Sequence, residues 1–104
     1  MEVVFFNSLV RQLLLSLQTP YAQKSFRYIK LLKYFGNQLG MPYSKQLAHN
    51  LFELRVRGQQ EIRILYCFDK NQAVIVHAFI KKTQKTPPKE IAIAQQRMAI
   101  LTKT

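Results

Sequence analysis

The residues best suited to chemistry in this chain are three arginines in two neighbouring β-favouring segments. Successive side chains of an extended strand point to opposite faces, so Arg55 and Arg57 share one face of the first segment. A Gly-Gln-Gln turn leads into the second segment and brings Arg57 opposite Glu61, and in that register Arg55 lies opposite Arg63. Because like charges directly across a ladder destabilise a sheet, a bound anion such as phosphate explains the placement. A solvated polar face, neutralised by Glu53 and Glu61, is the alternative that this hairpin leaves open.

More basic side chains follow the third β-favouring segment, in the run Lys-Lys-Thr-Gln-Lys-Thr-Pro-Pro. Lys81, Lys82 and Lys85 lie there between the end of a strand and the start of a helix. Thr86 is the expected N-cap of that helix and Pro87 its first residue. Loops held by a rigid scaffold often carry function, and helix N-termini favour phosphate. We therefore expect the lysines to form a second cationic edge beside the arginines, with the active centre in the groove between them.

Three other reactive side chains have simpler explanations. His77 lies inside the third strand segment, where a packed histidine at the core or rim competes with a role in acid/base chemistry. Cys67 lies inside the second segment with His77 as its only candidate partner, which favours buried packing over nucleophilic catalysis. Tyr66 shares a face with two isoleucines, which favours packing over stacking on a base.

The sequence contains no pattern typical of a metal or cofactor site. His49 and His77 are isolated from each other and from any cluster of cysteines or carboxylates. The chain has 3 glycines, all widely separated, so it lacks a glycine-rich loop for the phosphates of a nucleotide. We therefore expect neither a metal nor a cofactor.

Length and charge bound the class of protein. The 104 residues are enough for one domain, 1–104, and the hydrophobic fraction of 48% fits a folded chain. Lys and Arg number 16 against 5 Asp and Glu, a net charge of +11 that predicts a polyanionic partner: nucleic acid, an anionic membrane or an acidic protein. A lone cysteine, no signal peptide and no apolar run of about 18 residues predict a cytoplasmic protein that does not enter the membrane.

The apolar periodicity predicts an α+β fold in which three strands lie between helical segments. We expect 38–50 to be an irregular connector, and the strand at 73–82 to place Val74, Val76, Ala78 and Ile80 on one face. The full predicted order is a strand at 3–6, a helix starting at Asn7 or Ser8, a helix from Thr19 to Phe35, three strands between Phe52 and Lys82, and a last helix after Thr86.

The second predicted helix carries a basic stripe without acidic residues. Its cations recur every three residues, at Lys24, Arg27, Lys30 and Lys33. A solvated outer face explains such a stripe, and so does contact with nucleic acid or an acidic partner.

In this order of elements the chain resembles the RelE superfamily of toxins, and within it the HigB branch of phage-derived toxin-like proteins. The resemblance covers nearly the whole length. Its most specific parts are Leu-Phe-Glu-Leu-Arg at 51–55, Ile-Arg-Ile-Leu-Tyr at 62–66 and, above all, His-Ala-Phe-Ile-Lys-Lys-Thr-Gln-Lys-Thr-Pro at 77–87. It implies a small β-α-α-β-β-β-α fold, with a mainly antiparallel sheet and helices packed on one face.

The resemblance also implies a type II toxin that cleaves mRNA on the ribosome without a metal and so inhibits translation. A helix-turn-helix antitoxin would hold such an endoribonuclease inactive. Carried over residue by residue, the catalytic positions are Arg55, Arg63, Lys81 and Lys82, and the RNA-binding positions are Arg57, Lys85 and His77. Better-known members of the superfamily carry an arginine and then a tyrosine where this chain has 84–88. That departure leaves open a non-catalytic module of the same shape that binds RNA or an acidic protein.

Overall fold

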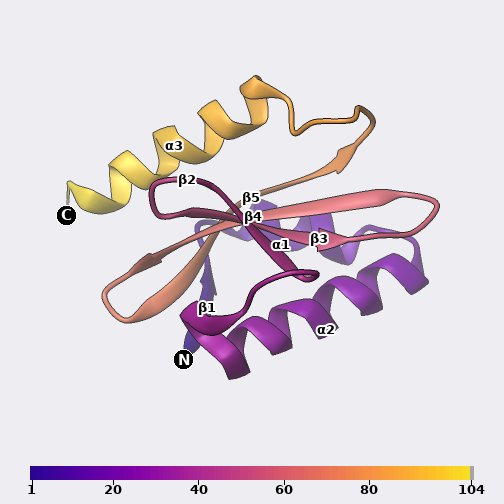
Figure 1. Cartoon of the computed structure of the whole chain (residues 1–104), viewed down its shortest axis with the longest axis horizontal. Helices are drawn as coiled ribbons and strands as arrows, with labels where there is room; N and C mark the ends of the chain where they lie inside the picture. The colour runs from indigo at the N-terminus through magenta and orange to yellow at the C-terminus, as the bar shows by residue number, and fades with distance from the viewer. Residues whose placement is uncertain (104) are drawn as a thin grey trace.

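A five-stranded mixed sheet runs through the centre of the molecule, and helices lie on both sides of it (Figure 1). The computed structural model describes residues 1–103. The strands lie in the order β1-β5-β4-β3-β2; β1 runs parallel to β5, and the other neighbours are antiparallel. The elements in chain order are β1 (Glu2–Phe5), α1 (Ser8–Leu15), α2 (Thr19–Phe35), a 3-10 turn (Gly36–Gln38), β2 (Ser44–Ala48), β3 (Leu51–Val56), β4 (Glu61–Asp69), β5 (Gln72–Lys81) and α3 (Pro88–Thr102).

The α+β class is confirmed, but the expectation that the helices pack on one face is wrong. Leu14 of α1 and Leu32 of α2 belong to a core on one face of the sheet. Ala94 of α3 packs on the other face, with Leu65 and Val74. Figure 1 shows α2 and α3 on opposite sides of the sheet. The reason is that β4 is apolar on both faces, so each face needs a covering layer.

Local sequence signals explain several helix ends. The Asn7 side chain accepts a hydrogen bond of 3.1 Å from a backbone N–H in the first turn and caps α1. α2 ends at Gly36, whose φ of 58° is readily adopted by glycine. The cap expected at Thr86 is wrong, because α3 begins at Pro88 and the Thr86 hydroxyl donates to the Glu53 carboxylate instead. Within residues 1–103, none of the helices is long and apolar enough to cross a bilayer.

The segment expected to be an irregular connector contains the edge strand β2. Ser44–Ala48 pairs antiparallel with β3, so the molecule has one strand more than the predicted order. Its residues, Ser-Lys-Gln-Leu-Ala, lack the β-branched and aromatic side chains typical of strands. The strand forms because β3 offers it a free edge, and because the Ser44 hydroxyl lies 2.5 Å from the Tyr66 hydroxyl in the core.

β5 contains a bulge near its middle. The consecutive β4 residues Leu65 and Tyr66 pair with His77 and Ile75, which leaves Val76 as an extra residue on β5. A bulged residue loses its place in the ladder, and here a side chain replaces the missing partner. The guanidinium of Arg97 on α3 donates to the Val76 carbonyl at 2.5 Å.

The bulge decides which face Lys81 occupies. Strict alternation from Val74, which lies under α3, would point Lys81 toward the opposite face. The extra residue instead returns Lys81 to the α3 side, where it lines a pocket with Arg63. The expected grouping of Val74 and Val76 with Ala78 is therefore wrong, since Ala78 belongs to the core on the other face.

Candidate active site

The sheet face on the α3 side has an apolar half and a charged half. Leu65 and Val76 lie in the half that α3 covers. Residues two apart along a strand share a face, so Arg63 continues the row of Leu65 into the charged half. Figure 1 shows the β3–β4 hairpin and the segment leading to α3 projecting to the same side of the molecule. The charged half of the face therefore lies between them.

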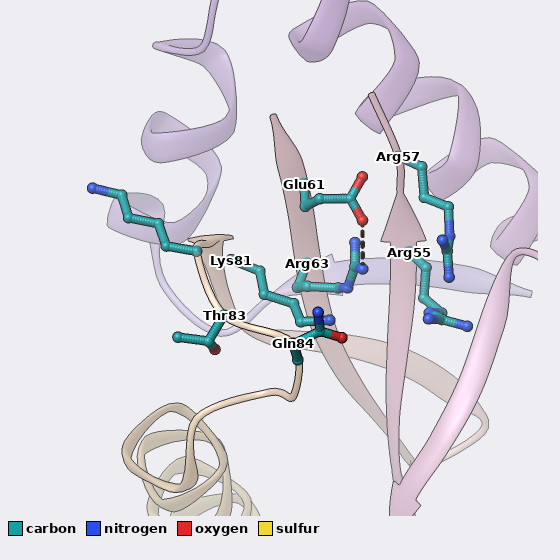
Figure 2. A pocket seen from close by; sticks show the side chains of 8 residues that line it. Arg55, Arg57, Glu61, Arg63, Lys81, Thr83 and Gln84 are labelled. Carbon is teal, nitrogen blue, oxygen red and sulfur yellow. Dashed lines mark hydrogen bonds and ion pairs between the residues drawn. The ribbon is translucent and has the colours of Figure 1, made fainter. Parts of the chain in front are cut away.

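This charged half forms a pocket of about 580 Å³, which we call the cationic pocket (Figure 2). The expected register is confirmed, since Arg55 pairs directly with Arg63. In Figure 2 the side chains of Arg55 and Arg57 extend from β3, beside those of Glu61 and Arg63. The lining residues come from β3, β4 and the β5–α3 segment and are Arg55, Arg57, Glu61, Arg63, Lys81, Lys82, Thr83 and Gln84.

Arg63 forms the floor of the pocket and is held in one orientation. Its side chain is only 1% exposed. One terminal nitrogen donates to a Glu61 carboxylate oxygen at 2.9 Å and the other to the Ile62 carbonyl at 3.1 Å. Its Nε is buried without a hydrogen-bond acceptor. The guanidinium thus supplies positive charge from below the surface, and the groups around it make the direct contacts with solvent.

A buried carboxylate lies between the two paired arginines. One Glu53 oxygen is 3.8 Å from Nε of Arg55 and 3.7 Å from Nε of Arg63. The other oxygen accepts the hydrogen bond from Thr86, in the segment that leads to α3. Glu53 therefore reduces the repulsion of the arginine pair and ties this segment to the sheet.

The carboxylates neutralise only part of the positive charge. Five cations line the cationic pocket, whereas Glu61 is the one carboxylate in its lining and Glu53 lies beneath. The alternative of a polar face neutralised by Glu53 and Glu61 is thus correct for Arg63, which contacts both carboxylates. Five cations against two carboxylates still leave three positive charges in excess. Arg57 and Lys82 are exposed to solvent. Such a surplus favours an anion in the pocket.

Two groups in the cationic pocket have shifted pKa values. Burial, reinforced by the charges of Arg63 and Arg55, lowers the pKa of Lys81 against the opposing effect of Glu53 and Glu61. Burial raises the pKa of Glu61, but the hydrogen bonds from Arg63 and Gly58 and the nearby arginine charges outweigh it and leave this pKa below its usual value. Glu61 therefore stays ionised, and Lys81 loses its proton more easily than an exposed lysine.

The structure places five of the seven sequence-predicted site residues in the cationic pocket: Arg55, Arg57, Arg63, Lys81 and Lys82. Lys85 lines a smaller neighbouring hollow with Lys45 and Glu53. His77 lies outside both hollows. Its Nε2 is 3.2 Å from Glu90 of α3, and its ring stacks on Phe79. This is the packed rim histidine that the sequence left as one alternative.

Sequence reasoning missed Thr83 and Gln84 as lining residues, and it missed the hydrogen bond from Thr86 to Glu53. The contact of Glu53 with the arginines was one of the two alternatives, because Glu53 lies two residues before Arg55 on the same strand face. Cys67 and Tyr66 are buried, as expected. Burial, together with the charge of Asp69, raises the pKa of the Cys67 thiol to about 11. Among residues 1–103, no three His, Cys, Asp or Glu side chains lie close enough together to hold a metal ion.

Fold and pocket together define a small basic α+β protein with a cationic pocket on one face of a mixed sheet. The chain belongs to the family of phage-derived Gp49-like proteins, whose family model matches residues 12–99. This is a toxin-like family of the RelE superfamily, so the resemblance found in the sequence is confirmed at that level. A toxin-like family also implies an antitoxin as partner. No curated protein matches the chain.

Proposed function

We propose that this protein is the toxin of a type II toxin-antitoxin system, of the HigB type, and that it cleaves mRNA on the ribosome. The observation that carries the proposal is the position of Lys81, an amine with a lowered pKa beside the paired Arg55 and the buried, fixed Arg63, in a pocket with excess positive charge. Lowered pKa values combined with a specific charge environment are typical of catalytic groups. Cleavage of mRNA during translation would stop protein synthesis.

The proposed reaction is a transesterification within the RNA. The 2′-oxygen of a ribose attacks the adjacent phosphorus, and the bond from phosphorus to the 5′-oxygen of the next nucleotide breaks. One product ends in a 2′,3′-cyclic phosphate and the other begins with a 5′-hydroxyl. A base must take the proton of the 2′-hydroxyl, and an acid must protonate the departing 5′-oxygen.

The lining residues suit these steps. Neutral Lys81 accepts the 2′-hydroxyl proton, and protonated Lys82 supplies the proton for the 5′-oxygen. Arg55 and Arg57 contact the phosphate oxygens, and the charge of Arg63 stabilises the developing negative charge from the floor of the pocket. Since Glu53 and Glu61 hold Arg63 before the substrate arrives, little reorganisation is needed during the reaction.

A non-catalytic RNA-binding module is the second candidate, and one observation favours it. The segment that closes the cationic pocket contributes Thr83 and Gln84 to its lining, and in the stretch 84–88 this chain lacks the arginine and tyrosine of better-known RelE-superfamily toxins. Neither a threonine nor a glutamine side chain exchanges protons readily near neutral pH. Without acid/base chemistry from lysines, the pocket would bind RNA and leave it intact.

The deciding experiment incubates the purified protein with translating ribosomes and a defined mRNA. We expect new RNA ends with a 2′,3′-cyclic phosphate and a 5′-hydroxyl, and no cut where the attacking ribose is replaced by 2′-deoxyribose. Lys82→Met should remove cleavage, while the matched control Lys33→Met on the exposed side of α2 should retain it. Folded wild-type protein that binds RNA but forms no new ends would support the binding module instead.

The antitoxin proposal has its own test. We propose a small helix-turn-helix protein as the partner. Its coexpression should restore growth to cells that produce the wild-type chain. Lys82→Met should remove toxicity yet leave antitoxin affinity within about threefold, because a single exposed side chain contributes little to a standard-sized interface. Loss of both properties together would assign Lys82 a structural role.

A further inference from the structure

A second hollow lies on α2, away from the proposed catalytic groups, and we call it the α2 groove. Its volume is about 630 Å³, and a carboxylate is absent from its lining. Tyr34 is 82% exposed there, although its ring packs edge-on against Phe35 with centroids 4.9 Å apart, and such exposure is unusual for a large aromatic side chain. The lining residues are Lys24, Arg27, Tyr28, Lys30, Leu31, Tyr34 and Tyr43.

The chemistry of the α2 groove combines cations with aromatic rings. α2 contains no Asp or Glu, so nothing on the helix itself neutralises Arg27 and Lys30. Tyr43 is 37% exposed and packs edge-on against Tyr28, with ring centroids 5.3 Å apart. Single-stranded RNA presents phosphates for cations and unpaired bases that stack on aromatic rings. A merely solvated helix face would need the cations but not the exposed rings.

The α2 groove adjoins the cationic pocket around the edge of the sheet. Lys24, which lines the groove, donates from Nζ to the carbonyl of Arg57, which lines the pocket, at 2.5 Å. Tyr43 of the groove accepts a backbone hydrogen bond of 2.8 Å from Arg55 of the pocket. Because β2 begins only at Ser44, the end of β3 has no strand outside it at this point. A single-stranded RNA that leaves the cationic pocket past Arg57 would therefore meet α2 without crossing another β-strand.

We propose that the α2 groove binds the single-stranded RNA that flanks the scissile phosphate. Bases would stack on Tyr34 and Tyr43, while Arg27 and Lys30 hold the phosphates between them. From Lys24 to Tyr34 the helix rises about 15 Å, which is enough for a few nucleotides. The inference rests on the proposed function, since that function places a phosphate in the cationic pocket. An acidic segment of a protein partner fits the charge as well, but it does not explain the continuity with the pocket.

The test measures fluorescence anisotropy with 2′-O-methyl RNA, which lacks the attacking hydroxyl and lets the wild-type protein be used. A 3-nucleotide RNA is expected to fill the cationic pocket alone, and a 9-nucleotide RNA to reach the α2 groove. Tyr34→Ala should weaken the long RNA about tenfold and leave the short one unchanged, because one base loses its stacking partner. Tyr34→Phe should restore binding, since the ring is kept.

Matched charge variants complete the test. Lys30 lines the α2 groove, whereas Lys33 is exposed on the same helix outside it. For the long RNA, Lys30→Ala should reduce the slope of log affinity against log salt by about 0.7, the value for one phosphate contact of a single strand, and Lys33→Ala should not.

Three outcomes would overturn the inference. Equal changes of the salt slope in Lys30→Ala and Lys33→Ala, or equal losses of affinity for short and long RNA in Tyr34→Ala, would exclude a specific RNA site in the α2 groove. Variants that bind both RNAs normally but lose affinity for the antitoxin would make the α2 groove a protein-docking surface. Failure of the wild type to bind the long RNA in solution would overturn the inference alone, because the proposed cleavage takes place on the ribosome, whereas RNA binding without cleavage of mRNA on the ribosome would overturn the enzyme alone.

Discussion

At the scale of single residues, the proposed chemistry depends most on Lys81. A general base must lose its proton near the working pH, and an exposed lysine rarely does so. In the cationic pocket, burial and the charges of Arg63 and Arg55 lower the pKa of this amine, while Glu53 and Glu61 act in the opposite direction. The environment therefore moves Lys81 toward the neutral form that accepts a proton.

The pH dependence of cleavage tests this role. The rate should rise with pH, because only neutral Lys81 accepts the 2′-hydroxyl proton, and it should level off at a pKa below the usual value of a lysine. Lys81→Arg keeps the charge but stays protonated, so the rising limb should disappear and the rate fall at least about a hundredfold. Affinity for 2′-O-methyl RNA should change little. A profile that Lys81→Arg leaves unaltered would assign the base to another group.

Glu53 provides a second test at this scale, and its readout is stability. Glu53→Gln removes the charge between two guanidiniums, of which Arg63 is buried. Breaking a buried pair from one side leaves an uncompensated charge, so the free energy of unfolding should fall by about 3 kcal/mol. Glu61→Gln is the matched control and should cost about 1 kcal/mol, because Glu61 is 33% exposed. Urea denaturation measures both, and equal losses would argue against a special role for Glu53.

At the scale of elements, the β5 bulge connects the fold to the site. The extra residue Val76 turns Lys81 toward Arg63, and α3 supports the bulge through the hydrogen bond from Arg97 to the Val76 carbonyl. Arg97 also lies over the ring of Phe6, 5.5 Å from its centroid. A helix that covers only the apolar half of the sheet face thus helps to set the geometry of the charged half.

Arg97→Met tests the support of the bulge. The variant keeps the apolar length of the side chain but leaves the buried carbonyl without a charged donor, which should lower the free energy of unfolding by about 2 kcal/mol. Lys89→Met, an exposed substitution on the same helix, should stay within about 0.5 kcal/mol of the wild type. An Arg97→Met protein as stable as this control would show that solvent satisfies the carbonyl equally well.

The strands of the sheet show which features could be predicted from the sequence and which could not. The pairing of Arg55 with Arg63 follows from the alternation of side chains and a short turn, both of which are local. The bulge at Val76 and the strand at Ser44–Ala48 are not local: each depends on a partner that folding brings from elsewhere, Arg97 in one case and β3 in the other. Periodicity therefore indicated the arginine face correctly and grouped the residues of β5 wrongly.

At the scale of the whole molecule, the acidic residues are too few to balance the positive charge. Of the 5 acidic residues, Glu53 and Glu61 pair with arginines at the cationic pocket and Glu90 pairs with His77. The 16 basic residues thus keep a net charge of +11 on a chain whose Cα radius of gyration is 12.6 Å. Self-repulsion of this kind destabilises the compact state, and a bound polyanion or added salt relieves it.

Thermal unfolding should therefore respond to salt and RNA in a specific pattern. Raising NaCl from about 50 to about 500 mM should raise Tm in the absence of RNA, because screening weakens the self-repulsion. At low salt, single-stranded 2′-O-methyl RNA at about 100 times its Kd should add about 2.7 kcal/mol, or about 10 °C or more in Tm, since it binds the folded chain. The RNA effect should vanish at high salt, where the phosphate contacts are lost. A neutral polymer of equal length is the control. If it raised Tm as much as the RNA, or if salt alone lowered Tm, the net charge would not be what limits the stability of this fold.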